Sequence, residues 1–365
     1  MRSFVVVAAL LVLVLGAAVV LAAADEPWVC PDYVQTMENK TLNLYNWATY
    51  IGETTIPDFE AACGVSVTSD FFDSNESMLT RLRQGNPGYD IVVPSDYAVP
   101  VMIEEGLLLP LDHTQLPNLD NLADDLRGSP YDPDTTYAIP YLWGTFGLGY
   151  STERVSEPVT SWAQFFEHDG PVAWIEDARL MISIALLLTG HDPNSSDPAA
   201  VADAKQYLID HSANVVVIAA DDGQEWLARG DVDMAIEYNG DIYQIGLDCE
   251  CDEFIYTLPG EGSGISSGFM AIPVGAQNPA LAHVFLDYIM DPQVAAEIAN
   301  FTTYPSPNQA AIDAALIDPA LLGNAGIYPP PEVRARLFFL LKQDAETEQL
   351  YNDVWTEIKL SIQAQ

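Results

Sequence analysis

The chain has 365 residues, of which 53 are Asp or Glu and only 13 are Lys or Arg, so its formal net charge at pH 7 is −40. Such a charge repels nucleic acids and anionic membrane surfaces, and we expect no nucleic-acid partner. The charge favours cationic partners, but for most of these residues the simpler interpretation is a solvated acidic surface. A chain of this length is too long for a single hydrophobic core, so we predict two domains.

The first 24 residues predict export. Arg2 precedes an apolar run from Phe4 to Ala24, and the small residues that end this run form a cleavage site before Asp25. The run could also span a bilayer, so an uncleaved N-terminal anchor is the alternative. No later segment is long and apolar enough to span. We therefore expect the rest of the chain to lie outside the cytoplasm.

From Leu42 the pattern alternates between strands and helices. The predicted strands are LNLY, VSVTSDFF and DIVVP, and the predicted helices are Thr54–Cys63, Glu76–Gln84 and Val99–Glu105, each closed by a glycine. This alternation is typical of a parallel sheet covered by helices on both faces. In such sheets ligands bind beyond the carboxyl ends of the strands.

An extended crossing, Tyr137–Tyr150, leads into a second α/β unit. Asp177 is the predicted N-cap of a buried helix, and a polar Gly/Ser loop is expected before a strand, GFMAIP, that returns to the first unit. The other predicted elements are the helices Ala178–Thr189, Ala199–Asp210, Gln224–Ala228 and Pro279–Met290 and the strands VVVIAA, DMAIEY and EFIYTLP. Two α/β lobes joined by extended crossings place a cleft between them that can close on a small molecule.

The four cysteines are Cys30, Cys63, Cys249 and Cys251. They allow three disulfide pairings, and an exported chain can oxidise them. Cys63 lies on the apolar side of a predicted helix and could instead be a buried free thiol. No histidine is spaced to complete a zinc site with Cys249 and Cys251, so we expect no metal and no cofactor.

One apparent catalytic motif does not meet its structural requirement. Gly264–Gly268 reads G-x-S-x-G, but the nucleophile elbow needs a strand before this motif and a helix after it. Here a strand is expected after it, and the only later histidine, His283, lies in an amphipathic helix. A secreted hydrolase is therefore a minor alternative, and we expect no enzyme activity.

Aromatic residues and carboxylates gather at predicted strand ends. Trp47 and Tyr50 follow the first strand, where they either pack over a neighbouring element or line a site for a ligand. The other candidates are Tyr97, Asp177, Tyr238, Asp241 and Tyr304. Taken together they suit a ligand with an apolar stem and ammonium ends, because aromatic faces attract cations and carboxylates accept charge-assisted hydrogen bonds.

The sequence resembles the spermidine/putrescine-binding proteins of ABC importers from about Leu42 to Pro307. The resemblance rests on an ordered set of segments: LYNWATYI, SNESMLTRL, YDIVVPSDYAV, MIEEGLL, YAIPYLWGT, TSWAQFF, EYNGD and YPSPN. It implies an α/β, two-lobed fold of the periplasmic-binding-protein type (class II), with the ligand in the cleft between the lobes. On this basis we expect a signal peptide at 1–24, an N-terminal extension at 25–41, a first lobe at 42–146 plus 269–315, and a second lobe at 147–268 plus 316–365.

The resemblance also implies a ligand site and a partner. Its ligand-binding positions correspond here to Trp47, Tyr50, Ser95, Tyr97, Asp177, Tyr238, Asp241 and Tyr304. The implied role is that of a monomeric protein of the periplasmic space, or of the outer face of the cytoplasmic membrane, that delivers a polyamine to an ABC permease. A different small cationic or amine-bearing ligand, or a sensor that docks on a receptor, is the alternative.

Three positions depart from the family pattern. Leu180 and Gly268 stand where the family commonly has Glu and Asp, and Ser266 replaces a common aromatic residue. Each charge-assisted hydrogen bond contributes about 1.5–3 kcal/mol, so the loss of two acids weakens binding of highly charged ligands. We therefore expect a preference for a ligand with one or two ammonium groups over one with three or four.

Overall fold

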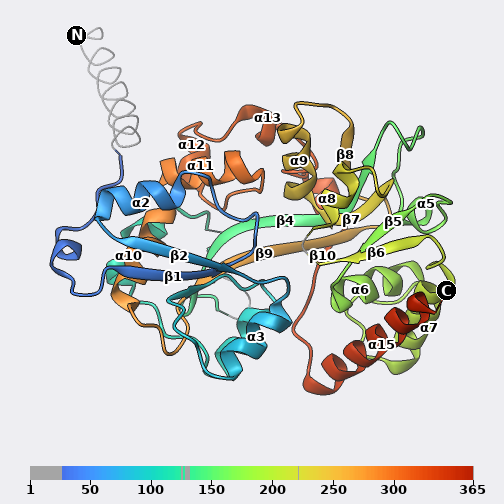
Figure 1. Cartoon of the computed structure of the whole chain (residues 1–365), viewed down its shortest axis with the longest axis horizontal. Coiled ribbons are helices and arrows are strands. Elements are labelled where there is room, and N and C mark those ends of the chain that lie inside the picture. The colour runs from blue at the N-terminus through green and yellow to red at the C-terminus, as the bar shows by residue number, and fades with distance from the viewer. Residues whose placement is uncertain (1–26, 125, 128–131, 221, 365) are drawn as a thin grey trace, which may run out of the picture.

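The computed structural model describes residues 27–124, 126–127, 132–220 and 222–364, so the predicted signal segment 1–24 lies outside the described residues. The named strands of these residues form one mixed sheet in the order β2-β1-β3-β9-β4-β7-β5-β6, with β10 beside β9 and β8 beside β4. Helices cover the two ends of this sheet, which gives the molecule a left and a right half in Figure 1.

The left half follows the predicted alternation. Strands β1 (Thr41–Asn46), β2 (Ser66–Phe71) and β3 (Ile91–Val92) are parallel, and helices α2 (Thr55–Cys63), α3 (Asn75–Arg83) and α4 (Ala98–Glu104) alternate with them. Helix α2 ends at Gly64, whose φ of +64° is the left-handed conformation that glycine adopts without a steric penalty. The Ser74 side chain caps α3 by accepting a hydrogen bond from the Ser77 N–H group.

Two long strands connect the halves. Strand β4 (Ala138–Ser151) pairs with β9 (Ser263–Ala271) over its first part and with β7 and β8 over its second part. This confirms the predicted crossing at Tyr137–Tyr150. The polar Gly/Ser loop predicted before GFMAIP is wrong, because the strand already begins at Ser263. Neighbouring strands supply hydrogen bonds that override the low strand preference of glycine and serine.

The right half contains β5 (Val172–Ile175), β6 (Val215–Ala219), β7 (Met234–Tyr238) and β8 (Phe254–Thr257). Its helices are α5 (Trp162–Phe166), α6 (Ala178–Leu188), α7 (Pro198–Asp210), α8 (Gly223–Ala228) and α9 (Asn239–Asp248). Asp177 caps α6 as predicted, accepting a hydrogen bond from the Leu180 N–H group. Helix α6 is buried almost throughout, as a sequence that is apolar on nearly every side predicts.

The C-terminal part packs on both halves. It comprises α10 (Pro279–Ile289), α11 (Pro292–Thr302), α12 (Gln309–Asp313), α13 (Pro319–Leu322), α14 (Pro331–Arg334), β10 (Leu337–Phe339) and α15 (Ala345–Gln363), and the short 3₁₀ turns of the chain are η1 (Asp32–Thr36), η2 (His113–Gln115) and η3 (Pro117–Asn121). Helix α10 lies with α2 in the left half, and α15 lies along α6 and α7 in the right half (Figure 1). No helix of the described residues is both long and apolar enough to cross a membrane.

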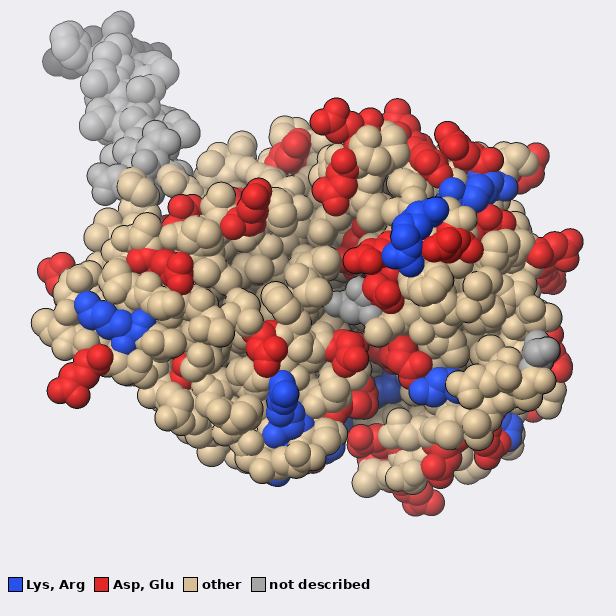
Figure 2. Space-filling model, in the orientation of Figure 1, with Lys and Arg blue, Asp and Glu red and all other residues tan. Residues whose placement is uncertain are grey.

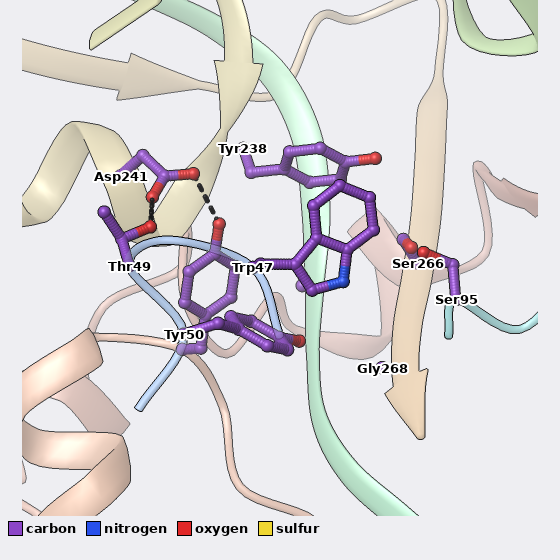
Figure 3. A pocket seen from close by; sticks show the side chains of 10 residues that line it. Trp47, Thr49, Tyr50, Ser95, Tyr238, Asp241, Ser266 and Gly268 are labelled. Atoms are coloured by element: carbon purple, nitrogen blue, oxygen red, sulfur yellow. Dashed lines mark hydrogen bonds between the residues drawn. The ribbon is translucent and has the colours of Figure 1, made fainter. Parts of the chain in front are cut away.

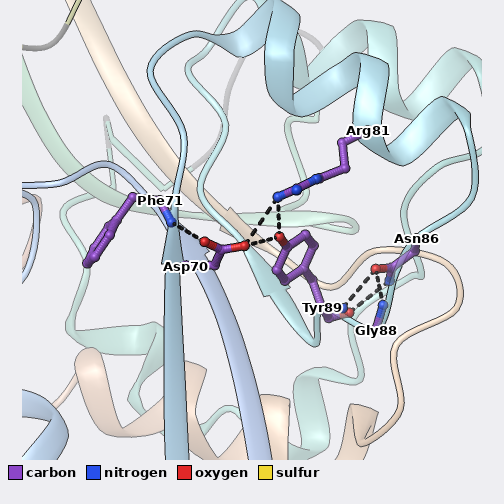
Figure 4. Close-up of polar contacts among 6 residues, drawn as sticks. All are labelled: Asp70, Phe71, Arg81, Asn86, Gly88 and Tyr89. Carbon is purple, nitrogen blue, oxygen red and sulfur yellow. Dashed lines mark hydrogen bonds and ion pairs between the residues drawn. The ribbon is translucent and has the colours of Figure 1, made fainter.

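Helix α3 is braced against the sheet by a polar cluster (Figure 4). The Arg81 guanidinium contacts the Asp70 carboxylate at 3.2 Å and the Tyr89 hydroxyl at 2.6 Å, and Tyr89 donates to Asp70 in turn. Asn86 closes the turn before Tyr89 by accepting from the Gly88 and Tyr89 N–H groups. These contacts fix the position of α3, whose first residue supports the site described below.

The cysteines form two disulfides, Cys30–Cys63 and Cys249–Cys251. The alternative that Cys63 is a free thiol is therefore wrong. Its side chain is fully buried, as the helix pattern predicts, but it is bonded to a cysteine of the N-terminal extension. The first bridge ties this extension to α2, and the second closes a tight turn after α9.

Candidate ligand-binding site

A cavity of about 50 Å³ lies where β1, β4, β7 and β9 come together. By the space that a buried water needs, this volume holds about three to five water molecules. Residues from both halves line the cavity: Trp47, Thr49, Tyr50, Ser95, Gly144, Tyr238, Asp241, Ser266, Gly268 and Tyr304 (Figure 3). Six of the eight predicted site residues are therefore brought together, namely Trp47, Tyr50, Ser95, Tyr238, Asp241 and Tyr304.

Trp47 both lines the cavity and supports the fold. Its indole Nε1 donates to the Val93 carbonyl at 3.0 Å, and its ring centroid lies 4.4 Å from that of Phe72. The side chain remains partly exposed and faces the cavity beside Tyr238 (Figure 3). Trp47 therefore packs against the core and also lines the cavity, and its contact with a ligand stays a prediction.

Tyr50 is held between two other tyrosines. Its ring meets those of Tyr141 and Tyr304 edge to face, with centroids 5.5 Å and 4.9 Å apart, and its carbonyl accepts from the Tyr141 hydroxyl at 2.9 Å. Burial, followed by the negative charges of Asp241 and Asp96, raises the pKa of the Tyr50 hydroxyl, which stays neutral at physiological pH. Tyr50 therefore presents a rigid aromatic face and a neutral hydroxyl to the cavity.

Asp241 supplies a buried carboxylate. It lies in the first turn of α9 and is 3% exposed, and it accepts hydrogen bonds from the Tyr304 hydroxyl at 2.6 Å and the Thr49 hydroxyl at 2.8 Å. Burial raises its pKa, whereas these two hydrogen bonds lower it. A β-carbon at Gly240 would lie only 2.1 Å from the Tyr304 ring, so glycine there permits the close approach of Tyr304.

Asn75, the first residue of α3, organises the loop after β3. Its amide donates at 3.0 Å to both the Ser95 and the Tyr97 hydroxyls and accepts from the Ser95 N–H group at 3.0 Å. Ser95 lines the cavity, whereas Tyr97 does not. Tyr97 is 5% exposed and lies beside the cavity with the Arg179 guanidinium 4.4 Å from its ring centroid.

Asp177 also lies outside the cavity lining. One of its carboxylate oxygens caps α6 through the Leu180 N–H group at 2.9 Å. Burial raises the pKa of Asp177, and the Arg179 guanidinium opposes this increase. The Leu180 side chain is fully buried in the core, so no carboxylate reaches the cavity from that position.

Gly268 does line the cavity, together with Ser266. A β-carbon at Gly268 would lie 2.7 Å from the Tyr50 ring and 2.9 Å from its hydroxyl oxygen, so Tyr50 occupies the space that a larger side chain would need. Sequence reasoning did not select Thr49, Gly144 and Ser266 as site residues. Thr49 was detectable from its position between Trp47 and Tyr50, and Ser266 from its departure from the family pattern, whereas Gly144 carries no distinguishing local signal.

The G-x-S-x-G segment is not a nucleophile elbow. It lies within β9, which continues to Ala271, so strand and not helix comes directly after the motif. His283 lies in α10, where its Nδ1 contacts the Pro279 carbonyl at 2.8 Å and its Nε2 accepts from the Asp112 N–H group at 2.9 Å. Both ring nitrogens are thus engaged in holding the backbone. No group of three or more potential metal ligands occurs among the described residues.

The chain is similar to bacterial binding proteins along most of its length. It is 33% identical to the "Putrescine-binding periplasmic protein SpuD" of Pseudomonas aeruginosa over 89% of this chain and 93% of that protein, and 32% identical to the "Putrescine-binding periplasmic protein PotF" of Escherichia coli over 88% and 92%.

A solved structure agrees with these relatives. The "Putative spermidine/putrescine ABC transporter from Listeria monocytogenes" superposes with a TM-score of 0.83 at 31% identity, covering 88% of this chain and 99% of that one. The fold is therefore the two-lobed α/β fold of substrate-binding proteins. Residues 54–321 match the family described as "Bacterial extracellular solute-binding protein". The chain belongs to this family of bacterial extracellular solute-binding proteins.

Proposed function

We propose that this protein binds a short polyamine, with putrescine as the first candidate, and delivers it to an ABC permease. The observation that carries the proposal is the buried Asp241 carboxylate in a cavity walled by Trp47, Tyr50, Tyr238 and Tyr304. A carboxylate offers about four acceptor sites, and within the described part of the chain two hydroxyls donate to the Asp241 carboxylate. An ammonium group can take a remaining site while the aromatic faces cover its methylenes.

The size and charge of the cavity favour a short ligand. The volume suits an unbranched chain of a few atoms, and Asp241 is the one carboxylate among the residues that line it. Each further ammonium group that lost its water without gaining an anion would be costly. The names of the similar Pseudomonas and Escherichia proteins point to the same ligand class.

The proposed cellular role follows from the family. The protein acts as an exported monomer, in the periplasmic space or anchored at the outer face of the cytoplasmic membrane, and has no catalytic step. Its two lobes, 42–146 plus 269–315 and 147–268 plus 316–365, close on the ligand and present it to the permease. Tyr97 and Asp177 belong to the surroundings of the bound ligand in this proposal.

Calorimetric titration of the purified protein with putrescine, spermidine and spermine tests the ligand. We expect putrescine to bind more tightly than spermine, and Asp241→Asn to lower the putrescine affinity by about 1.5–3 kcal/mol, the contribution of a charge-assisted hydrogen bond. Asp169→Asn is the matched control, because Asp169 is exposed in the turn after α5. Tight spermine binding that is insensitive to Asp241→Asn would contradict the proposal.

A further inference from the structure

The Cys249–Cys251 bridge closes the turn between α9 and β8 (Figure 1). Cys249 is the C-cap residue of α9, and the Cys251 N–H group donates to the Gly246 carbonyl at 3.2 Å. The Glu250 N–H group donates to the Leu247 carbonyl at 3.1 Å. These two hydrogen bonds form a Schellman motif, which satisfies the last carbonyls of a helix. The bridge therefore joins the C-cap residue to the second residue beyond it.

The residue between the two cysteines is strained. Glu250 has a φ of +51°, in the left-handed region that is costly for side chains other than glycine. The corresponding position of a Schellman motif is usually glycine. Opening the bridge allows Glu250 to leave this conformation, which favours the dithiol form. Because the bridge encloses a single residue, its loss adds little freedom to the unfolded chain, and we expect the protein to stay folded.

The two bridges of the chain differ in access. Cys249 is exposed and Cys251 is half-buried, so a thiolate from solution can reach the outer sulfur. In the other bridge Cys30 is half-buried, but Cys63 is fully buried in the apolar core of the left half. Attack at Cys30 would release a thiolate at Cys63 into this core, which is costly. An incoming thiol should therefore open the Cys249–Cys251 bridge and spare the other.

The charges around the turn favour some thiols over others. Asp248, Glu250 and Asp252 flank the two cysteines, and all three are exposed. The segment 230–333 contains no Lys or Arg. Arg154, from β4's end of the chain, pairs with Glu253 at 3.1 Å. Anionic thiols are therefore repelled at low ionic strength, whereas a thiol that carries an ammonium group is not.

We propose that the Cys249–Cys251 bridge is a thiol–disulfide exchange site for small aminothiols. A thiolate attacks the Cys249 Sγ atom, forms a mixed disulfide with it and releases Cys251 as a thiolate, which takes a proton from water. A second thiolate attacks the outer sulfur of the mixed disulfide and releases Cys249. Two small thiols are thereby oxidised to one disulfide while one protein disulfide is reduced. Neither cysteine lines the ligand cavity.

Mass spectrometry of the folded wild-type protein tests which bridge opens. The protein is incubated with cysteamine, and samples taken at intervals are blocked with iodoacetamide and digested. We expect the Cys249 and Cys251 thiols to appear at least about tenfold faster than those of Cys30 and Cys63, because exchange rates follow access to sulfur and the stability of the leaving thiolate. Equal rates for the two bridges, or faster opening of Cys30–Cys63, overturn the inference.

A comparison of two thiols tests the role of charge. The attacking form of cysteamine has no net charge, because its ammonium group balances its thiolate, whereas that of 3-mercaptopropionate carries two negative charges. Each rate is divided by the rate of the same thiol with hydroxyethyl disulfide, which is uncharged, so that differences in nucleophilicity cancel. We expect the normalised rate of cysteamine to be about threefold higher or more at low salt, and the two rates to converge at high salt.

A charge-neutralised variant provides the control for this comparison. Asp248→Asn/Glu250→Gln/Asp252→Asn should remove the difference between the two thiols at low salt. Asp169→Asn, which removes an exposed charge in the turn after α5, should retain it. Equal normalised rates in the wild type at low salt overturn the preference for aminothiols. Wild-type protein whose Cys249–Cys251 bridge reacts with neither thiol overturns the exchange site itself.

Discussion

At the scale of single residues, the aromatic side chains of the cavity are also parts of the core. Trp47 contacts Phe72 and the Val93 carbonyl, and Tyr50 is held by Tyr141 and Tyr304. Such anchoring fixes the rings before a ligand arrives, which lowers the entropic cost of binding. The same anchoring means that substitutions in the wall affect both affinity and stability.

Trp47→Ala separates these two contributions. We expect the putrescine affinity to fall by about 1–3 kcal/mol, because the variant loses a cation–π face and apolar contact. The midpoint of thermal unfolding should also decrease, since the Val93 carbonyl and the Phe72 ring each lose a partner. Trp47→Phe should recover part of the affinity, as it keeps an aromatic face. Calorimetry and circular dichroism measure the two effects, and a variant that keeps full affinity would exclude Trp47 from the wall.

The raised pKa values of two carboxyls predict opposite effects of pH on binding and stability. Burial raises the pKa of Asp96 to about 7, although the Arg179 guanidinium opposes this increase, and burial likewise raises the pKa of the Asp241 carboxyl. Between pH 4 and pH 7 the folded protein therefore holds more protons than the unfolded chain, so the free energy of unfolding should decrease as pH rises through this range.

Putrescine affinity should show the reverse trend. An ammonium group binds the charged Asp241 carboxylate, so the affinity should rise as pH rises through the raised pKa of Asp241 and level off above it, with a slope approaching about tenfold per pH unit well below that pKa. The amines themselves stay protonated throughout this range. Titrations and urea unfolding at pH 5, 6, 7 and 8 check both trends: Asp96→Asn should flatten the trend in stability, and Asp241→Asn the trend in affinity. Affinity independent of pH would show that the ligand does not depend on the charge of Asp241.

At the scale of secondary structure, the sequence predicts regular elements better than irregular ones. Helix α6 was predictable because a capping residue, Asp177, precedes an apolar run. Strand β4 was predictable because it is a long apolar stretch. Helix α9 was not, since EYNGD has the composition of a turn. Asn239 and Gly240 disfavour a helix interior but are tolerated in its first turn, where the helix dipole also stabilises Asp241.

The same limit applies to the site. The residues that follow strands β1, β3 and β7 could be located from sequence, because ligand positions in this architecture lie at strand ends. The separation of Tyr97 and Asp177 from the cavity lining depends on side-chain packing around Arg179, which involves elements far apart in sequence. The Tyr50 ring occupies the space that a side chain at position 268 would need, and this contact between distant segments likewise cannot be deduced from sequence.

The two disulfides should differ strongly in their contribution to stability. Cys30–Cys63 joins residues 33 apart, and loop-closure entropy predicts that its loss lowers the free energy of unfolding by about 3–4 kcal/mol. Cys249–Cys251 joins residues 2 apart and constrains the unfolded chain far less. Urea unfolding of Cys30→Ser/Cys63→Ser, with Cys249→Ser/Cys251→Ser as the matched control, measures the difference. Equal losses in the two double variants would contradict the entropic account.

At the scale of the whole molecule, the negative charge acts on ligand capture rather than on ligand choice. Acidic side chains outnumber basic ones over the face shown in Figure 2, which is notched at its lower edge between the two halves. Charges on this surface are screened at physiological salt, so they raise the rate at which cations arrive more than they raise affinity. In the proposed function, the Asp241 carboxylate within the cavity is shielded from salt and selects the cation that stays bound.

Contacts between the halves indicate how binding is coupled to closure. Thr49 donates to Asp241 at 2.8 Å, Arg179 lies 4.4 Å from the centre of the Tyr97 ring, and Lys342 forms an ion pair with Glu104. The first contact lies within the cavity, and the second lies beside it. A ligand that touches both halves binds only the arrangement in which they are close, and therefore shifts the population towards that arrangement.

Small-angle scattering should consequently show a smaller radius of gyration at saturating putrescine than without it. Asp241→Asn, measured at the same putrescine concentration, should show less compaction because its affinity is lower, and n-butylamine should compact the wild type less than putrescine because it engages fewer contacts. Glu104→Gln removes an ion pair between the halves without touching the cavity, so it should weaken closure by less than about 1 kcal/mol, as is usual for exposed pairs. A radius that stays constant while calorimetry reports full occupancy would mean that the halves do not move relative to each other, and that the ligand enters a cavity already formed.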